Sequence, residues 1–157
     1  TNSFHGRTLA TISASKQEKH MAGFSPMLGG FDQVAFGNLN EMRGMITDET
    51  AAILVEPIQG EGGINFAAED YLNQLRETAN EFDILLFLDE VQTGMGRLGK
   101  LFGYELYGVE PDVITLAKGM GETYARGHQA VDIGGRNIWI AQRPYGVVAL
   151  LVGADPQ

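Results

Sequence analysis

Three short apolar runs, each followed by a polar residue, constrain the fold of this chain more than any other feature. They span residues 51–55, 84–88 and 113–116, and a helical pattern follows each of the first two. Runs of this length and composition are typical of buried strands. Strands that alternate with helices indicate βαβ crossovers. The sequence therefore predicts an α/β fold, a mostly parallel sheet with helices on both faces.

The segments between these runs predict the remaining elements. Residues 67–82 place Tyr71, Leu72, Leu75 and Ala79 on one helical face, as in an amphipathic helix. Asn38 is a suitable N-cap for a helix over residues 38–46. Short helices are expected at residues 8–15 and 99–108, a short strand at 33–36, and a long loop at 16–32.

Polar side chains follow each of the three predicted strands. Glu56 and Asp89 end the first two runs, and Lys118 ends the third. The carboxyl ends of parallel strands meet at one edge of a sheet, where ligands bind, so these side chains are expected to converge. A lysine in this position either extends to solvent or acts as a nucleophile that forms a Schiff base.

Asp89 and Lys118 alone could form a structural ion pair. However, the glycine-rich stretches "QGEGG", "TGMGRLG" and "KGMG" surround them, and glycine lets the backbone approach a ligand closely. Pyridoxal phosphate needs a lysine for the Schiff base and an acid on the pyridine nitrogen. The set therefore predicts this cofactor, with Lys118 also placed as a general base.

Four motifs occur in a fixed order: "FHGRT", "EPIQGEGG", "LDEVQTGMGRLGKLF" and "LAKGMG". Over residues 1–121 they resemble the class III (ornithine-type) aminotransferases, and most of all the acetylornithine-type members. The resemblance implies the central part of the large domain of a fold-type I pyridoxal-phosphate-dependent transferase. It also implies transfer of the terminal amino group of N-acetylornithine, or a related ω-amino substrate, to 2-oxoglutarate. Full-length relatives are homodimers, and a cytoplasmic location is expected.

The resemblance assigns cofactor-binding roles by position. It implies that Lys118 is the Schiff-base lysine and that Asp89 meets the pyridine nitrogen. Phe4 would stack on one face of the cofactor ring and Val91 would pack on the other. Gln92 would hydrogen-bond the 3-oxygen of the ring.

The resemblance also assigns residues around the substrate. Arg7 would hold a substrate carboxylate, a task that suits a guanidinium group. Glu61 matches a glutamate that pairs with an arginine further along the chain and helps select between amino-acid substrates. His5 and Glu56 would lie in the polar shell near Asp89, with His5 among the cofactor-binding residues and Glu56 among the substrate-binding residues. Taken singly, Phe4, Arg7, His5 and Glu61 could each be an ordinary structural or surface residue.

Two other functions remain open at this stage. Gly94, Gly96 and Gly99 satisfy the G-x-G-x-x-G pattern of dinucleotide-binding domains, after a strand and before a predicted helix. Against that pattern, Asp89 and Glu90 would put negative charge near a bound pyrophosphate. The third hypothesis is a non-catalytic remnant of an aminotransferase.

The resemblance stops after residue 121. We therefore divide the chain into a partial large domain, residues 1–121, and an unassigned tail, residues 122–157, in which 137–142 and 145–153 have the apolar character of strands. Most phosphate-binding residues of the family precede position 1, whereas a threonine of the partner subunit and the small domain belong to sequence beyond residue 121. Cutting such a sheet from its neighbours is expected to expose apolar surface.

Composition excludes several classes of function. The formal charge of −9 and the pI near 4.7 argue against a broad nucleic-acid surface. The chain has no cysteine, which excludes disulfides and thiolate metal sites, and no metal is expected. No stretch approaches the roughly 18 apolar residues of a membrane span. The expected partners are small molecules.

Overall fold

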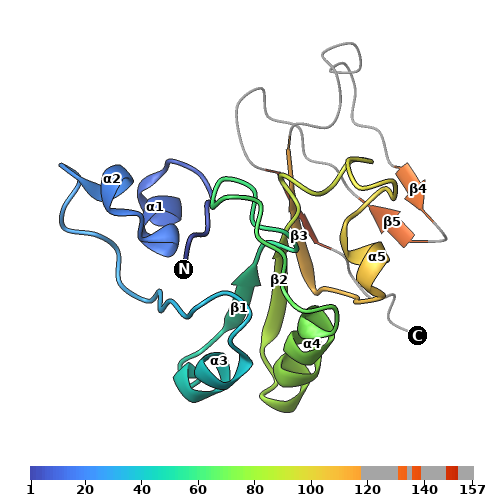
Figure 1. Cartoon of the computed structure of the whole chain (residues 1–157), viewed down its shortest axis with the longest axis horizontal. Helices are drawn as coiled ribbons and strands as arrows, with labels where there is room; N and C mark the ends of the chain where they lie inside the picture. Colours follow the sequence, from blue (N-terminus) through green and yellow to red (C-terminus); the bar gives the residue numbers. More distant parts are fainter. Residues whose placement is uncertain (118–130, 134–135, 139–147, 152–157) are drawn as a thin grey trace, which may run out of the picture.

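A four-stranded sheet forms the centre of the molecule (Figure 1). The computed structural model describes residues 1–117, 131–133, 136–138 and 148–151. Strands β1 (Ala52–Val55), β2 (Leu85–Asp89) and β3 (Val113–Leu116) are parallel neighbours, and β6 (Val148–Leu151) pairs with β3 in the antiparallel direction. The prediction of an α/β fold with a mostly parallel sheet is confirmed.

The register of the sheet brings two of the three predicted polar ends together. Val55 pairs with Leu88, so Glu56 follows β1 at the level where Asp89 ends β2. Asp89 itself pairs with Thr115 of β3. The predicted convergence of Glu56 and Asp89 is confirmed. Lys118 lies outside the described residues.

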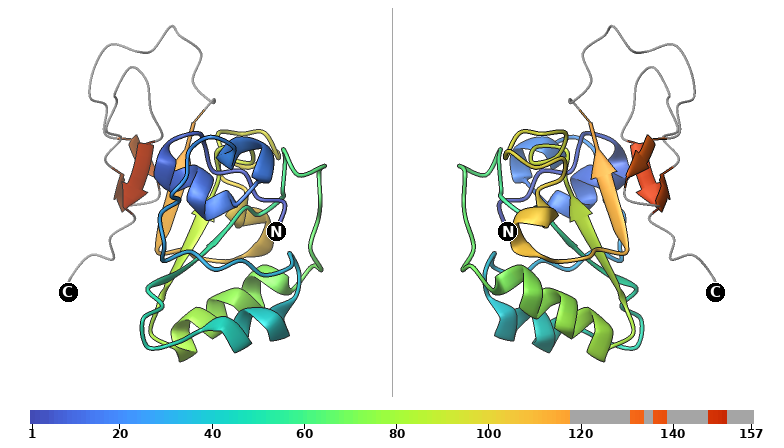
Figure 2. Two further views of the ribbon diagram at one scale, coloured as in Figure 1. Left: turned by 90° about the vertical axis from the view of Figure 1, so that its left-hand side faces the viewer. Right: turned by 90° about the vertical axis from the view of Figure 1, so that its right-hand side faces the viewer.

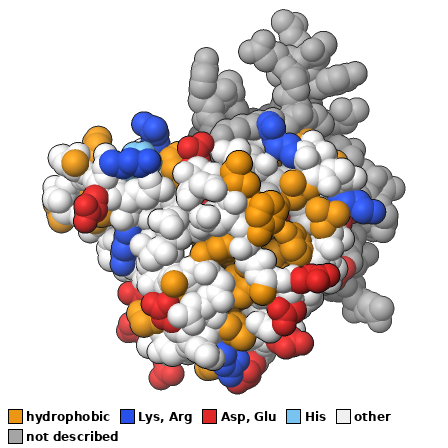
Figure 3. Space-filling model, in the orientation of Figure 1, with side chains coloured by type: hydrophobic (Ala, Val, Ile, Leu, Met, Phe, Trp, Pro, Cys, Tyr) orange, Lys and Arg blue, Asp and Glu red, His pale blue; other side chains and the backbone are white. Residues whose placement is uncertain are grey.

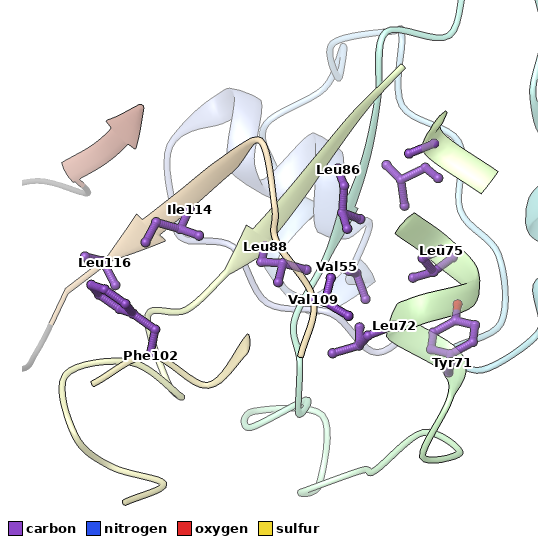
Figure 4. Close-up of a cluster of buried hydrophobic side chains, with 12 residues drawn as sticks. Val55, Tyr71, Leu72, Leu75, Leu86, Leu88, Phe102, Val109, Ile114 and Leu116 are labelled. Atoms are coloured by element: carbon purple, nitrogen blue, oxygen red, sulfur yellow. The ribbon is translucent and has the colours of Figure 1, made fainter. Parts of the chain in front are cut away.

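Helix α4 (Tyr71–Glu81) covers one face of the sheet. Its buried face carries the four apolar residues that the sequence predicted, Tyr71, Leu72, Leu75 and Ala79. They meet the inward side chains of the strands, among them Leu86 and Leu88 of β2, which are fully buried (Figure 4). Burial of one such side chain contributes about 1.5–3 kcal/mol, which makes this cluster the main source of stability.

The other face of the sheet is more open. Ala52 and Leu54 of β1 pair with Leu85 and Phe87 of β2, so these four side chains share one face. Leu54 is 39% exposed and Leu85 is 49% exposed. These exposed fractions agree with the expectation that the sheet leaves apolar surface exposed. Figure 3 also shows apolar side chains gathered near the middle of one face of the molecule.

Helix α1 (Leu9–Ser15) forms where the sequence predicted a short helix. Thr8 is its N-cap and exchanges hydrogen bonds with Thr11 in a capping box, which satisfies backbone groups of the first turn. Ala10 and Ala14 of α1 line the same cavity as Leu54 and Phe87, so α1 lies on the open side of the sheet (Figure 2).

Two further predicted helices are present. Helix α3 (Leu39–Met45) begins after Asn38, whose side chain accepts a hydrogen bond from the Glu41 backbone N–H, as predicted for an N-cap. Helix α3 contacts α4. Helix α5 (Tyr104–Tyr107) occupies part of the predicted segment 99–108 and ends at Gly108, which has a positive φ of 63°.

Two predictions between α1 and α3 are wrong. The segment predicted as a loop contains a one-turn helix, α2 (Glu18–Met21). The segment 33–36 does not form a strand. Its polar groups bond elsewhere: the Gln33 side chain donates to the carbonyl oxygens of Ala14 and Ser15, and the Ala35 N–H donates to the Glu41 carboxylate. The segment therefore links α1 to the start of α3.

Three strands are described at the end of the chain, and two of them, Arg136–Ile138 and Val148–Leu151, overlap the two segments that had apolar character. Strands β4 (Val131–Ile133) and β5 (Arg136–Ile138) form a two-stranded antiparallel sheet. Strand β6, from the second apolar segment, joins the main sheet beside β3. The predicted division at residues 121 and 122 falls outside the described residues and stays a prediction.

Candidate active site

Asp89 is the centre of the candidate site, at the carboxyl end of β2. Its side chain is buried, with 3% exposure for the residue. Three groups donate hydrogen bonds to it: His5 Nδ1 to Oδ2 at 2.7 Å, Thr115 Oγ1 to Oδ1 at 2.8 Å, and the Val91 backbone N–H to Oδ1 at 3.1 Å. An ionised carboxylate only accepts hydrogen bonds, so this arrangement stabilises a negative charge at the strand end.

Glu56 is a second buried carboxylate at the same edge, 5% exposed. It accepts hydrogen bonds from the backbone N–H groups of Phe4, at 2.9 Å, and Gly60, at 3.2 Å. Burial raises the pKa of Glu56 above the ordinary glutamate value, and the nearby charge of Asp89 raises it further, while the two N–H groups and His5 lower it in part. Through the hydrogen bond from the Phe4 N–H, Glu56 anchors the N-terminal segment against the sheet.

The N-terminal segment crosses the strand ends through several other contacts. Gln59 donates from its side chain to the Thr1 carbonyl oxygen at 2.7 Å, and Gln17 donates to the Ser3 carbonyl oxygen at 2.6 Å. Gly62 packs so closely on this segment that an added Cβ would lie 2.3 Å from the Asn2 carbonyl oxygen. These contacts hold the segment that carries Phe4 and His5.

The aromatic rings of this segment have defined neighbours. The His5 ring meets the Phe87 ring edge-on, with ring centroids 6.3 Å apart. The Phe4 ring meets the His20 ring in the same way at 5.7 Å. Edge-to-face pairs of this kind orient aromatic rings. His20 of α2 was missed by the sequence analysis because its segment was predicted as a loop.

Val91 and Gln92 follow Asp89 and are half-buried. The Gln92 side chain donates to the exposed Glu61 carboxylate at 3.5 Å, which joins the loop after β2 to the loop after β1. The Arg7 side chain is exposed. The predicted roles of these four residues toward cofactor and substrate stay predictions.

An open cavity of about 590 Å³ lies against the open face of the sheet. Phe4, His5, Glu56 and Asp89 are among the residues that line it, and it extends along β1 toward α3. Arg7, Glu61, Val91 and Gln92 are not among its lining residues. The structure thus brings four of the nine predicted site residues around a shared space and leaves four others on loops outside it. The ninth, Lys118, lies outside the described residues.

Glu90 is a site residue that the sequence analysis did not assign. It is fully buried, and its carboxylate accepts hydrogen bonds from the Thr93 hydroxyl and from the backbone N–H groups of Gly103 and Tyr104, at 2.9 and 2.7 Å. Burial raises the pKa of Glu90, and these hydrogen bonds oppose the rise. Glu90 therefore fixes the loop between β2 and α5.

The glycine pattern that resembled a dinucleotide fingerprint lies in the loop that Glu90 holds. Residues 91–100 form turns, and no helix begins among them. The backbone N–H groups at the start of α5 bind the Glu90 carboxylate, which occupies the position of an anion. Gly94 packs on the Glu90 carbonyl oxygen, where an added Cβ would lie at 2.9 Å. Gly96 and Gly99 have nothing within 4 Å of an added Cβ, but their positive φ values of 88° and 84° favour glycine. Packing and turn geometry thus explain the three glycines, and the structure does not support a dinucleotide site.

Within the described residues, two kinds of feature are absent. No group of three or more His, Asp or Glu side chains could hold a metal ion. No helix is long and apolar enough to cross a membrane.

The sequence matches a known family over most of its length. The family model "Aminotransferase class-III" matches residues 1–132. The acetylornithine aminotransferase of Agrobacterium fabrum is 55% identical over 124 residues, which cover 79% of this chain and 31% of that protein. The acetylornithine aminotransferase of Methanothermobacter thermautotrophicus is 52% identical over 126 residues, 80% of this chain and 32% of that protein. The chain thus spans about a third of the length of these relatives.

Solved structures agree with the sequence match. The ornithine aminotransferase of Toxoplasma gondii superposes with a TM-score of 0.75 and 28% identity, over 96% of this chain and 31% of that protein. N-acetylornithine aminotransferase from Stenotrophomonas maltophilia superposes with a TM-score of 0.63 and 32% identity, over 98% of this chain and 31% of that protein. The family match, the relatives and the shared fold lead to one conclusion: this chain belongs to the class-III aminotransferases.

Proposed function

We propose that the carboxyl ends of β1, β2 and β3 bind pyridoxal phosphate, and that the protein is a transaminase acting on N-acetylornithine or a related ω-amino substrate with 2-oxoglutarate as acceptor. The observation that carries the proposal is the buried Asp89 carboxylate, held by three donors at the end of the central strand. Family membership supports it, and the active site of the Toxoplasma gondii ornithine aminotransferase holds pyridoxal phosphate at partial occupancy.

The residues present fit this cofactor by their chemistry. A buried carboxylate that only accepts hydrogen bonds favours a cationic N–H partner, which a protonated pyridine nitrogen provides. When bound, pyridoxal phosphate supplies an electron sink for the charge left after a substrate loses a proton from the carbon that bears its amino group. Asp89 would keep the ring nitrogen protonated, and His5 would hold Asp89 in place.

Other residues would bind and orient the cofactor and the substrate. Phe4 is half-buried beside His5, and its backbone is held on Glu56, so it can present its ring to one face of a planar ligand. Val91, fixed through its N–H to Asp89, would cover the other face. Lys118 would hold the cofactor covalently and move the proton. Gln92 would bind the 3-oxygen, and Arg7 and Glu61 would bind the substrate, with Glu56 behind them.

The family relationship also motivates proposals about the whole protein. We propose a homodimer in the cytoplasm, as the resemblance on which the site assignments rest implies. The similarity to two acetylornithine aminotransferases supports acetylornithine as the amino donor. The alternative of a non-catalytic remnant predicts that the chain binds cofactor without turnover.

Borohydride trapping tests the proposed function. The purified chain is incubated with pyridoxal phosphate, reduced, digested and mapped by mass spectrometry. We expect the adduct on Lys118 and its loss in Lys118→Ala, with Lys100→Ala as the matched control. Adducts spread over Lys16, Lys19 and Lys100 as readily as Lys118 would contradict a site. Glutamate formation from 2-oxoglutarate, compared between N-acetylornithine and ornithine, then tests the donor.

A further inference from the structure

Thr115 is the only polar residue of β3, a strand whose four residues are all buried. The residue is 2% exposed. A buried hydroxyl without a hydrogen-bond partner would destabilise the fold, so the one hydrogen bond that the Thr115 hydroxyl makes within the described part of the chain is informative. Thr115 Oγ1 lies 2.8 Å from Asp89 Oδ1, and the two residues are direct partners in the register of β2 and β3. The pairing of the strands thus determines this contact.

The hydrogen bonds to the Asp89 carboxylate are distributed unevenly between its two oxygens. Each carboxylate oxygen has about two acceptor positions. Oδ1 accepts from both Thr115 and the Val91 N–H, whereas among the described residues Oδ2 accepts only from His5. Oδ1 is therefore fully used, and Oδ2 keeps one acceptor position.

We propose that Thr115 is a positioning residue that fixes the Asp89 carboxylate so that Oδ2 is the oxygen that meets the ring nitrogen of the cofactor. This inference rests on the proposed function. The terminal torsion of an aspartate side chain is broad when nothing restrains it. Here one donor comes from β3 and another from the loop after β2, so rotation of the carboxylate breaks both bonds. Thr115 acts through Asp89 and need not touch the cofactor.

A pair of ligands isolates this role from general effects on folding. The first ligand is pyridoxal phosphate, and the second is its carbocyclic analogue, in which a C–H group replaces the ring nitrogen. Both have the same phosphate, aldehyde and shape, but only the first can donate to Asp89. The ratio of their dissociation constants, measured by absorbance titration of the same protein, reports the contact at the nitrogen.

The expected results separate the variants. Thr115→Val keeps the volume and removes the hydroxyl, and we expect its affinity for pyridoxal phosphate to fall about tenfold, the loss typical of one hydrogen bond to a charged group. Its affinity for the carbocyclic analogue should match that of the wild type. Thr115→Ser should restore most of the preference for pyridoxal phosphate.

Thr78→Val is the matched control. Thr78 is also a buried threonine, 1% exposed, but its hydroxyl donates to the Gln74 carbonyl oxygen within α4. This variant should bind both ligands as the wild type does. If Thr115→Val does not fold, as judged by circular dichroism, Thr115→Ala removes the same hydroxyl and replaces it in the comparison.

The outcomes distinguish the two proposals. If the wild type does not bind pyridoxal phosphate, or binds both ligands equally, the proposed function fails and this inference fails with it. If the wild type prefers pyridoxal phosphate but the Thr115 variants keep that preference, only the inference is overturned. An equal loss of affinity for both ligands would show that Thr115 supports the fold alone, which also overturns the inference.

Discussion

The imidazole of His5 and the carboxylate of Asp89 share a hydrogen bond of 2.7 Å across 84 residues of sequence. Because an ionised carboxylate has no proton to give, His5 donates from Nδ1. The contact joins the N-terminal segment to the end of β2. The edge-on packing of His5 against Phe87 fixes the plane of the imidazole ring. The proposed cofactor site therefore depends on two parts of the chain that only the fold brings together.

The first prediction concerns the His5 donor. His5→Phe keeps an aromatic ring against Phe87 but removes the hydrogen bond to Asp89. We expect the affinity for pyridoxal phosphate to fall about tenfold, as for loss of a hydrogen bond to a charged group. The free protein should also lose about 1–3 kcal/mol of stability, because Asp89 Oδ2 loses its donor. Titration followed by absorbance measures the affinity. His5→Asn, whose amide can donate in place of Nδ1, should retain more affinity than His5→Phe, and the reverse order would contradict the role of the donor.

The second prediction concerns the packing of Gly62 on the N-terminal segment. A Cβ at position 62 would lie 2.3 Å from the Asn2 carbonyl oxygen, so Gly62→Ala must displace the segment that carries Phe4 and His5. We expect weaker binding of pyridoxal phosphate, measured by the same titration. At Gly29 an added Cβ has nothing within 4 Å, so Gly29→Ala is the control and should bind normally. Equal affinities for the two variants would show that the segment does not shape the site.

The third prediction concerns the pH dependence of stability. The pKa of Glu56 is raised in the folded protein, mainly by burial, from an ordinary value of 4.5. A carboxyl group with a raised pKa favours folding most when it is protonated. Its contribution is complete below pH 4.5 and is lost as the pH rises through the folded-state pKa.

Glu56→Gln removes this titration. The free energy of unfolding of the variant minus that of the wild type should therefore rise between pH 4 and pH 7, the direction set by the raised pKa. Urea denaturation at the two pH values measures it. A difference that is constant or falls with pH would refute the assigned direction of the pKa shift.

The fourth prediction concerns the loop that Glu90 holds. At Gly103 an added Cβ would lie 2.8 Å from Glu90 Oε2 and 3.0 Å from Thr93 Cβ. Gly103→Ala should destabilise the protein by about 1–3 kcal/mol, as overpacking of a buried position usually does. Gly44, in α3, has open space around it, so Gly44→Ala should stabilise by roughly 0.5–1 kcal/mol through helix propensity. Urea denaturation compares the two, and a stable Gly103→Ala would contradict the packing described for Glu90.

Much of the fold could be predicted because the relevant signals are local. The apolar runs of β1, β2 and β3, the helical period of α4 and the cap at Asn38 each depend on neighbouring residues. Helix α2 was missed because it has a single turn and no side-chain cap. The strand predicted at 33–36 is wrong because its polar groups bond to α1 and to Glu41, contacts that no local pattern indicates.

The same contrast between local signals and long-range contacts applies to the residues of the site. Order and spacing of motifs pointed to Asp89, and parallel strand ends placed Glu56 beside it. Thr115 and Glu90 were missed because their roles depend on strand register and on a loop that returns to the end of β2. A weak signal for Thr115 was present, since it is the one polar residue in an otherwise apolar strand, and such a residue needs a buried partner.

The protonation state of the cofactor nitrogen tests the central claim most directly. Pyridoxal phosphate labelled with ¹⁵N in the ring is bound to the protein, and its nitrogen chemical shift is measured by NMR at neutral pH. We expect the shift of a protonated pyridine nitrogen in the wild type and that of an unprotonated one in Asp89→Asn, with the exposed Asp48→Asn as a control that behaves as the wild type. An unprotonated nitrogen in the wild type, or a protonated one in Asp89→Asn, would contradict the account.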